Sequence, residues 1–224
     1  MGTSTAHPSP KTKEWQEARD QYRRQHVNAG QLVRAVARAI DPSFEAAMAG
    51  EPVARCLDVL LRHAGEGGLD SDPDASRVGY RIREAAREEL SRAGTSRQAE
   101  TALDAVFLTA LAQVDARREE ELPEALPPIE QQFVAHYVAG VFKHLVARDS
   151  SEFIGGDGLP TVGDRATLSE QCERMCVDVV YAADPSPLTG IGEFRGDRIR
   201  HIADGLAPVV ADVLDRLRKG RARP

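Results

Sequence analysis

The segment from residue 129 to residue 148 constrains the fold more than any other part of the chain. It reads IEQQFVAHYVAGVFKHLVAR, and its apolar residues cover more than half of a helical circumference rather than a single stripe. Such a helix must be covered on several sides, so the segment predicts a central helix with other helices packed around it. The apolar residues concerned are Val134, Tyr137, Val138, Val141, Phe142, Leu145 and Val146.

The rest of the chain supplies candidates for the surrounding helices. Apolar residues recur at spacings of three and four near residues 32–40, 53–61, 78–90, 103–114 and 199–217. No segment shows the strict alternation of a strand bounded by hairpin turns. The sequence therefore predicts an all-α protein, a single globular bundle of about seven or eight helices. In the last segment, Pro208 predicts a kink or the start of a new helix.

Two breaks divide this helical pattern. Residues 65–76, GEGGLDSDPDAS, have the composition of a loop, and residues 122–128, LPEALPP, are the best candidate for a boundary between two sub-bundles. We therefore expect a tail at 1–12, an N-terminal sub-bundle at 13–121, a C-terminal sub-bundle at 129–219 packed on it as one domain, and a basic tail at 220–224.

The charge of the chain is unevenly distributed. The net charge is -6, yet residues 1–38 carry seven Lys or Arg against three acidic residues, and residues 216–224 carry five against none. The remaining residues hold 17 basic and 32 acidic side chains, a net charge of -15. An acidic body repels a phosphate backbone, so nucleic acid is not an expected partner except through the basic termini.

The composition also bears on the compartment. No apolar run approaches the roughly 18 residues of a membrane-spanning helix, and residues 1–12 lack the apolar core of a secretory signal. Three cysteines are too few, and odd in number, for a disulfide framework. We expect a cytoplasmic protein with no membrane partner, and the excess of arginine over lysine, with abundant alanine, suggests a bacterial origin.

Cys172 and Cys176 lie four residues apart in the stretch CERMC, which raises the question of metal or redox chemistry. In a helix they share a face with Leu168, Met175 and Val179. No second cysteine pair and no histidine pair at metal-binding spacing accompanies them. Core packing is the favoured interpretation and a metal or redox site the weaker one, so neither a metal nor a cofactor is expected.

Two loops carry the candidate ligand-binding residues. Residues 149–166, DSSEFIGGDGLPTVGDRA, lack the lysine of a phosphate-binding loop, and the segment 184–197 is a second loop of similar character. If the two loops lie at the same end of the bundle, they frame one cleft with Phe153 and Phe194 as walls. The charged residues that would then converge are Asp157, Asp164, Arg165 and Arg195. The alternative is that both are ordinary surface loops, of which the first is flexible or partly disordered.

The triplet GDR occurs in both loops and predicts how the following helices begin. Asp164 and Asp197 suit the position that caps a helix N-terminus. In the first copy, Thr167 and Glu170 form a competing capping box, so that helix has two predicted starts.

The N-terminal segment at 11–27, KTKEWQEARDQYRRQHV, mixes basic and aromatic residues. Trp15, Tyr22, Arg23 and Arg24 are its candidate partner-binding residues, because such a mixture suits nucleic acid or an acidic protein surface. The alternative, which we favour, is that Trp15, Ala18 and Tyr22 form one helix face that docks this segment on the chain's own acidic body.

No catalytic set emerges from these motifs. The sequence has no nucleophile elbow, no phosphate-binding loop and no paired metal-binding carboxylates on a helix. The leading prediction is a non-enzymatic regulatory or accessory protein that acts through contacts with another protein or with a second copy of itself. The alternatives are a small-ligand binder or enzyme with a pocket between loops 149–166 and 184–197, and a nucleic-acid accessory protein that uses the basic termini.

Overall fold

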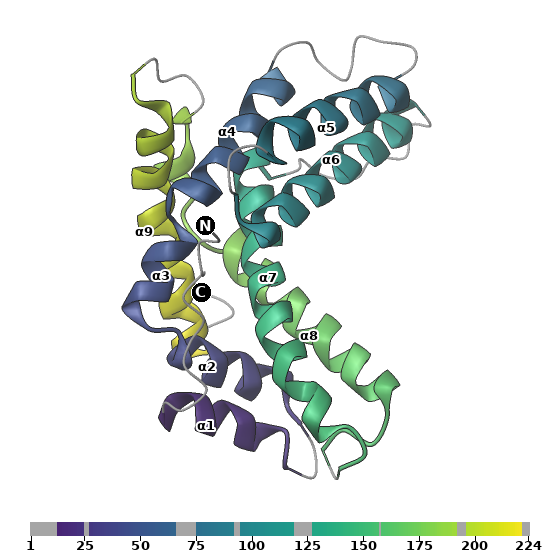
Figure 1. The fold of residues 1–224 in the computed structure, drawn as a ribbon, viewed down its shortest axis with the longest axis vertical. Helices are drawn as coiled ribbons and strands as arrows, with labels where there is room; N and C mark the ends of the chain where they lie inside the picture. The colour runs from purple at the N-terminus through teal and green to yellow at the C-terminus, as the bar shows by residue number, and fades with distance from the viewer. Residues whose placement is uncertain are drawn as a thin grey trace. The chain divides into compact units, whose positions relative to one another are not determined.

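The prediction of an all-α, multi-helix bundle is confirmed. The computed structural model describes residues 13–24, 27–65, 75–91, 95–118, 127–156, 158–191 and 196–220. In these residues the chain forms α-helices and two short 3-10 helices, and the only pairing of extended backbone is an isolated bridge between Ile154 and Leu159. Figure 1 shows the helices in chain order, from α1 in purple to α9 in yellow.

The helices belong to two compact units, each assembled from segments that are distant in sequence. Unit 1 comprises Met1–Met48, Val138–Asp184 and Ala207–Pro224, and unit 2 comprises Ala49–Tyr137 and Pro185–Leu206. These units differ from the two contiguous sub-bundles expected at 13–121 and 129–219. Most of the predicted boundary at 122–128 lies outside the described residues.

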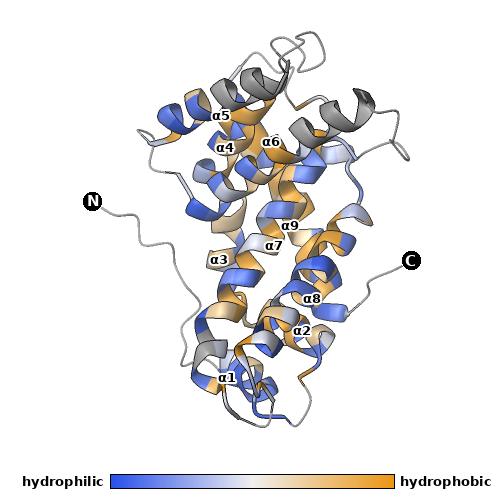
Figure 2. Cartoon of the chain, turned by 90° about the vertical axis from the view of Figure 1, so that its right-hand side faces the viewer, coloured by the Kyte–Doolittle hydropathy of each residue, from blue (hydrophilic) through white to orange (hydrophobic). Residues whose placement is uncertain are grey.

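Unit 1 contains α1 (Lys13–Gln21), α2 (Ala29–Ala39), α3 (Pro42–Met48) and α8 (Val162–Tyr181), with the later parts of α7 (Ile129–Ser150) and α9 (Arg198–Lys219). Helix α1 packs on α2, and α2 packs on α8. Most residues of α1 are hydrophilic, and the helix is largely blue in Figure 2. Its few apolar residues are buried and pack against the rest of the unit.

Helices α2 and α3 begin where short polar side chains accept hydrogen bonds from exposed backbone amides. The Asn28 side chain accepts from the Gln31 amide at 3.1 Å, and the Asp41 carboxylate accepts from the Phe44 amide at 2.8 Å. Asp41 and Pro42 follow the end of α2. They also start α3, because aspartate caps a helix and proline suits its first turn.

Unit 2 contains α4 (Glu51–Gly65), α5 (Ala75–Ser91) and α6 (Arg97–Arg118), which pack against one another, and the first part of α7. Asp104 of α6 accepts hydrogen bonds from Arg83 at 2.9 Å and from Arg87. Buried Asp58 of α4 is likewise shared by Arg62 and Arg198, with nitrogen–oxygen distances of 3.1 and 2.5 Å. Two carboxylates thus each hold two arginines in this unit.

Helix α7 is buried over most of its circumference, as its apolar pattern predicts, and Lys143 and His144 are exposed. Neighbouring residues that point in different directions are all inaccessible to solvent, and among them are Phe133, Val134, Ala135, Val138 and Ala139. The expectation of a central helix touched on several sides is confirmed.

Helix α9 continues through Pro208 from Arg198 to Lys219, so the predicted restart at this proline is wrong. Proline removes one helical hydrogen bond, but Pro208 and Asp204, whose carbonyl loses its donor, are both exposed. Water can satisfy that carbonyl, which makes the interruption tolerable. None of the described helices combines the length and the apolar character needed to cross a bilayer.

Candidate binding groove in unit 1

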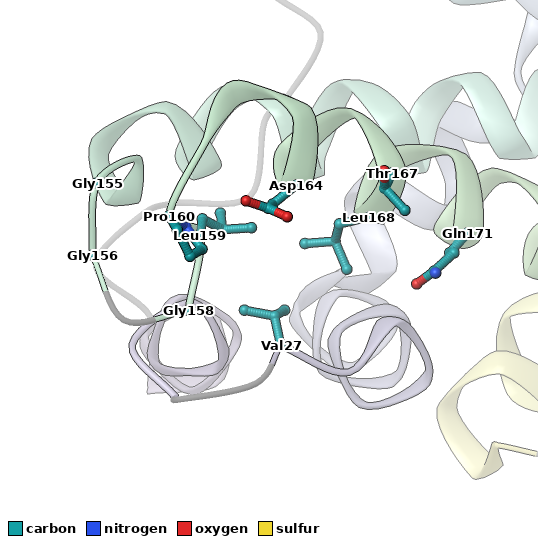
Figure 3. Close-up of a pocket in the computed structure, with 10 residues that line it drawn as sticks. All are labelled: Val27, Gly155, Gly156, Gly158, Leu159, Pro160, Asp164, Thr167, Leu168 and Gln171. Atoms are coloured by element: carbon teal, nitrogen blue, oxygen red, sulfur yellow. The ribbon is translucent and has the colours of Figure 1, made fainter.

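A groove lies in unit 1 beside the first three turns of α8. Its volume is about 870 Å³, and Figure 3 shows the residues that line it. One wall is the glycine-rich segment before α8, another is the connection between α1 and α2, and α8 supplies the third. The lining residues are Val27, Gly155, Gly156, Gly158, Leu159, Pro160, Asp164, Thr167, Leu168 and Gln171.

The described residues of the glycine-rich wall form a turn closed by a backbone hydrogen bond. Helix α7 runs to Ser150, and a 3-10 turn occupies Ser151–Phe153. The Gly155 amide then donates to the Leu159 carbonyl at 2.8 Å, which closes the turn. Gly155 has a φ of 88°, a conformation that favours glycine. Of the loop predicted at 149–166, only residues 151–161 separate the two helices.

Gly158 fixes this wall against the end of α1. A Cβ atom at position 158 would lie 2.3 Å from the Tyr22 carbonyl oxygen and 2.6 Å from that of Arg24. Only glycine therefore permits the close approach of the two backbones. The position of the groove wall depends directly on the packing of α1.

The α8 wall starts with a capping box. Thr161 accepts from the Asp164 amide at 3.1 Å, and the Thr161 amide donates to Oδ2 of Asp164 at 2.9 Å. The Thr161 hydroxyl donates to the same oxygen at 2.6 Å. In the described part of the chain Oδ1 accepts no hydrogen bond, so the carboxylate is held in place with one oxygen left for a ligand.

This capping box corrects both predicted starts of α8. Asp164 occupies the third position of the helix and not the cap itself, and Thr167 and Glu170 lie within the helix. Thr161 provides the cap because it precedes Asp164 by three residues. At the second GDR copy, Asp197 accepts from the Arg200 amide at 3.3 Å, so the predicted aspartate cap is confirmed there.

Four side chains of α8 face the groove at helical spacing. Asp164, Thr167, Leu168 and Gln171 follow at intervals of three, one and three residues, which places them on one face of the helix. In Figure 3 Leu168 points toward Val27 across the groove, with the Asp164 carboxylate and the Gln171 amide on either side. The groove therefore has an apolar centre with hydrogen-bonding groups along it.

The structure describes two of the four predicted ligand-binding residues, Asp164 and Arg165, and gives them different surroundings. Asp164 lines the groove, but Arg165 donates from Nε to the Ser150 hydroxyl at 2.9 Å and from Nη2 to the Ala147 carbonyl at 3.1 Å. Arg165 thus satisfies the C-terminal end of α7, which suits a cation. Asp157 and Arg195 lie outside the described residues, as does Phe194, so the cleft expected from the two loops stays a prediction.

Two of the four predicted partner-binding residues of the N-terminal segment are buried. Trp15 and Tyr22 are only 1% and 3% exposed. The Tyr22 hydroxyl donates to the Val146 carbonyl at 3.1 Å, its ring stacks on Phe153 at 5.3 Å, and Arg148 lies over the Trp15 ring. The alternative that this helix face docks on the chain's own body is confirmed. A partner could reach Trp15 or Tyr22 only if α1 moved away.

The arginines of this segment stay at the surface. Arg23 pairs with Asp20 at 2.7 Å and lies over the Phe153 ring, whereas Arg24 donates to the Gln31 side chain at 3.0 Å. Binding of a partner by Arg23 and Arg24 stays a prediction.

All three cysteines are free and buried. Burial raises the pKa of Cys172 to about 12, and it raises the pKa of Cys56 to about 12 as well, with Glu100 adding to the shift. The pKa of Cys176 is raised well above its usual range by complete burial. These thiols stay protonated near neutral pH, which agrees with core packing. Among the described residues no group of three or more His, Cys, Asp or Glu side chains is arranged to hold a metal ion.

Sequence reasoning identified the glycine-rich segment but missed most of the groove. The spacing of Asp164, Thr167, Leu168 and Gln171 was available once α8 was placed correctly. Val27 had no such signal, because it lies more than a hundred residues away in the sequence. Comparison of the chain with known proteins finds no matching family model, no matching curated protein and no matching solved structure. Its function is therefore inferred from its own residues.

Proposed function

We propose that the protein is a non-enzymatic binding module that takes an extended segment of a partner protein into the groove beside α8. The proposal rests on the mixture of apolar and hydrogen-bonding groups that line one groove, whose volume is about 870 Å³. A peptide presents the same mixture, because each of its residues has a polar backbone and alternate side chains face one wall.

Each part of the groove suits one part of such a ligand. Leu168 and Val27 offer an apolar contact for a side chain of the partner. The Thr167 hydroxyl and the Gln171 amide can bond the backbone of the peptide. Among the described lining residues Asp164 is the one that carries a charge, and it favours a basic side chain. The preferred segment is therefore apolar with a lysine or arginine beside the apolar residue.

The same inventory argues against catalysis in the groove. Asp164 is the one titratable side chain among the groove's described lining residues. Acid–base or nucleophilic catalysis requires at least a second positioned group, such as a base beside a nucleophile. We therefore infer recognition and not turnover.

A small-molecule ligand is the second candidate, and the size of the groove favours it. Pockets for small ligands typically measure about 300–1,000 Å³, and the groove falls in that range. Mass spectrometry of the purified protein under native conditions distinguishes the two. A tightly held small molecule, released on denaturation, would favour this second candidate.

We infer that the protein works in the cytoplasm. Its three cysteines are buried and none forms a disulfide, which suits a reducing compartment. Reversible folding in the presence of a thiol reductant would agree with this assignment.

The binding proposal is tested by panning random linear peptides, displayed on phage, against the full-length protein. The matched variants are Thr167→Arg, which places a cation in the groove, and Ala166→Arg, which adds the same charge at an exposed neighbouring position outside its lining. Selected peptides should bind the wild type and Ala166→Arg alike, and should bind Thr167→Arg at least roughly tenfold more weakly. Equal binding to all three proteins, or no enrichment of any sequence, would sink the proposal. Sedimentation equilibrium of the same three proteins would reveal whether a second copy is the partner, since Thr167→Arg alone would then be monomeric.

A further inference from the structure

A second, smaller concavity lies on unit 1 where the surfaces of α1 and α2 meet. Its volume is about 200 Å³, and three arginines line it: Arg24, Arg34 and Arg38. Gln21 and Gln31 add side-chain amides. This concavity shares no lining residue with the groove beside α8.

Two of these arginines lack a partner within the described residues. Nε of Arg34 is buried and makes no hydrogen bond there. No ion pair or hydrogen bond to the side chain of Arg38 occurs in that part of the chain either, and Arg24 donates only to the neutral side chain of Gln31. A buried donor without an acceptor is costly, and a ligand that supplied an acceptor in this concavity would relieve that cost.

The balance of charge in the concavity is positive. Glu17 is the single acidic residue among its lining residues, and its carboxylate lies 3.9 Å from Nζ of Lys13. The described lining therefore has three guanidinium groups and one carboxylate, and that carboxylate already has a lysine as its counter-ion. Because the body of the chain is acidic, it repels an anion, whereas this positively charged concavity attracts one.

The end of α9 holds Arg34 in position. Gly220 has a φ of 67°, and a Cβ atom there would lie 2.0 Å from Nη2 of Arg34. The guanidinium group thus packs directly on the backbone at the C-terminal end of α9.

We propose that this concavity binds the phosphate group of a small phosphorylated molecule. Guanidinium groups form paired hydrogen bonds to phosphate oxygens, and several arginines with few acids are the usual means of holding a dianion. The described lining contains no aromatic ring on which a nucleobase could stack. The site therefore recognises the phosphate and not a base, and a compact ligand fits its volume better than a polymer.

Calorimetric titration of the full-length protein with pyrophosphate and with inorganic phosphate tests the proposal. The variant is Arg34→Gln with Arg38→Gln, and the control is Arg97→Gln with Arg200→Gln, which removes the same charge from exposed positions of unit 2. Pyrophosphate should bind the wild type and the control equally, and the variant at least roughly tenfold more weakly. Binding that the Arg34 and Arg38 changes leave unaltered, or no binding to the wild type, would overturn the proposal.

Two further measurements keep the outcome decisive. Arg38→Gln alone changes an exposed residue and should weaken binding even if the double variant does not fold. A short single-stranded oligonucleotide without a terminal phosphate should bind more weakly than pyrophosphate at the same ionic strength. Tighter binding of the oligonucleotide, lost in the Arg34 and Arg38 variant, would contradict a small-molecule ligand and assign the site to nucleic acid.

Discussion

The arginines of α5 in unit 2 and those of α2 in unit 1 have different surroundings. In unit 2 Arg83 and Arg87 of α5 share Asp104 of α6, and Arg198 of α9 pairs with Asp58 of α4, so three arginines join helices through two carboxylates. On α2 of unit 1, Arg34 and Arg38 face a concavity with no acidic partner in the described residues. Paired cations stabilise a fold, whereas cations left without a counter-ion are available to a ligand. Unit 1 also has structural arginines, such as Arg218 with Glu45, but the arginines of α2 are the ones that we propose to bind a ligand.

Removal of Asp104 should have the largest effect on stability and none on binding. Asp104→Ala leaves two arginines without their shared acceptor at a site where the carboxylate is only 18% exposed. We expect a loss of about 2–3 kcal/mol in the free energy of unfolding. Urea unfolding measures the loss, and calorimetry should find unchanged affinity for pyrophosphate and for a selected peptide. A parallel loss of affinity would show that the proposed binding surfaces of unit 1 depend on these ion pairs of unit 2.

A methyl group at position 158 should be the next most harmful change. Gly158→Ala forces a Cβ atom into the carbonyl oxygens of Tyr22 and Arg24, and we expect a loss of about 2 kcal/mol together with weaker peptide binding. Gly140→Ala is the control, because its Cβ atom would meet nothing within 4 Å inside helix α7. That change should stabilise the protein by about 0.5–1 kcal/mol. Equal effects of the two substitutions would contradict the close packing of the groove wall.

The sequence predicts the helices better than it predicts the groove. The apolar circumference of α7 indicates its burial correctly, because burial follows from residue type and helical period alone. The start of α8 was misjudged because three aspartate or threonine positions in a short stretch all suit a cap, and only the folded backbone selects Thr161. Arg165 was assigned to a ligand, whereas it binds the end of α7; composition does not reveal which acceptor a guanidinium group will find.

Acid should remove the contribution of Asp104 in a defined direction. Burial alone would raise the pKa of this carboxyl. The hydrogen bonds from Arg83 and Arg87 lower the pKa by more than burial raises it, so in the folded protein it lies below its usual range. The stabilisation is complete above the unfolded pKa of about 3.9 and is lost as the pH falls through the folded pKa. Urea unfolding between pH 7 and pH 2 measures the free energy of unfolding of the wild type and of Asp104→Asn. The difference between these two free energies should therefore shrink only below about pH 4. If this difference in the free energy of unfolding stayed constant across the range, the ion pairs of Asp104 would not be its cause.

The smallest effect expected is the reactivity of the cysteines. A pKa of about 12 for Cys172 keeps its thiol protonated, and all three thiols are buried. A polar alkylating reagent at neutral pH should modify them only after denaturation, as measured by mass spectrometry. Rapid modification of the native protein, or stoichiometric zinc in the purified sample, would restore the metal or redox interpretation of CERMC.

Amide hydrogen exchange of the full-length protein, with and without a selected peptide, tests the central claim most directly. The account predicts slower exchange at residues 155–161 and 164–172 of unit 1, with no change along α5 and the described part of α6 in unit 2. Protection should disappear in Thr167→Arg and persist in Ala166→Arg. Slower exchange confined to unit 2, or none at the groove while the peptide is bound, would contradict it.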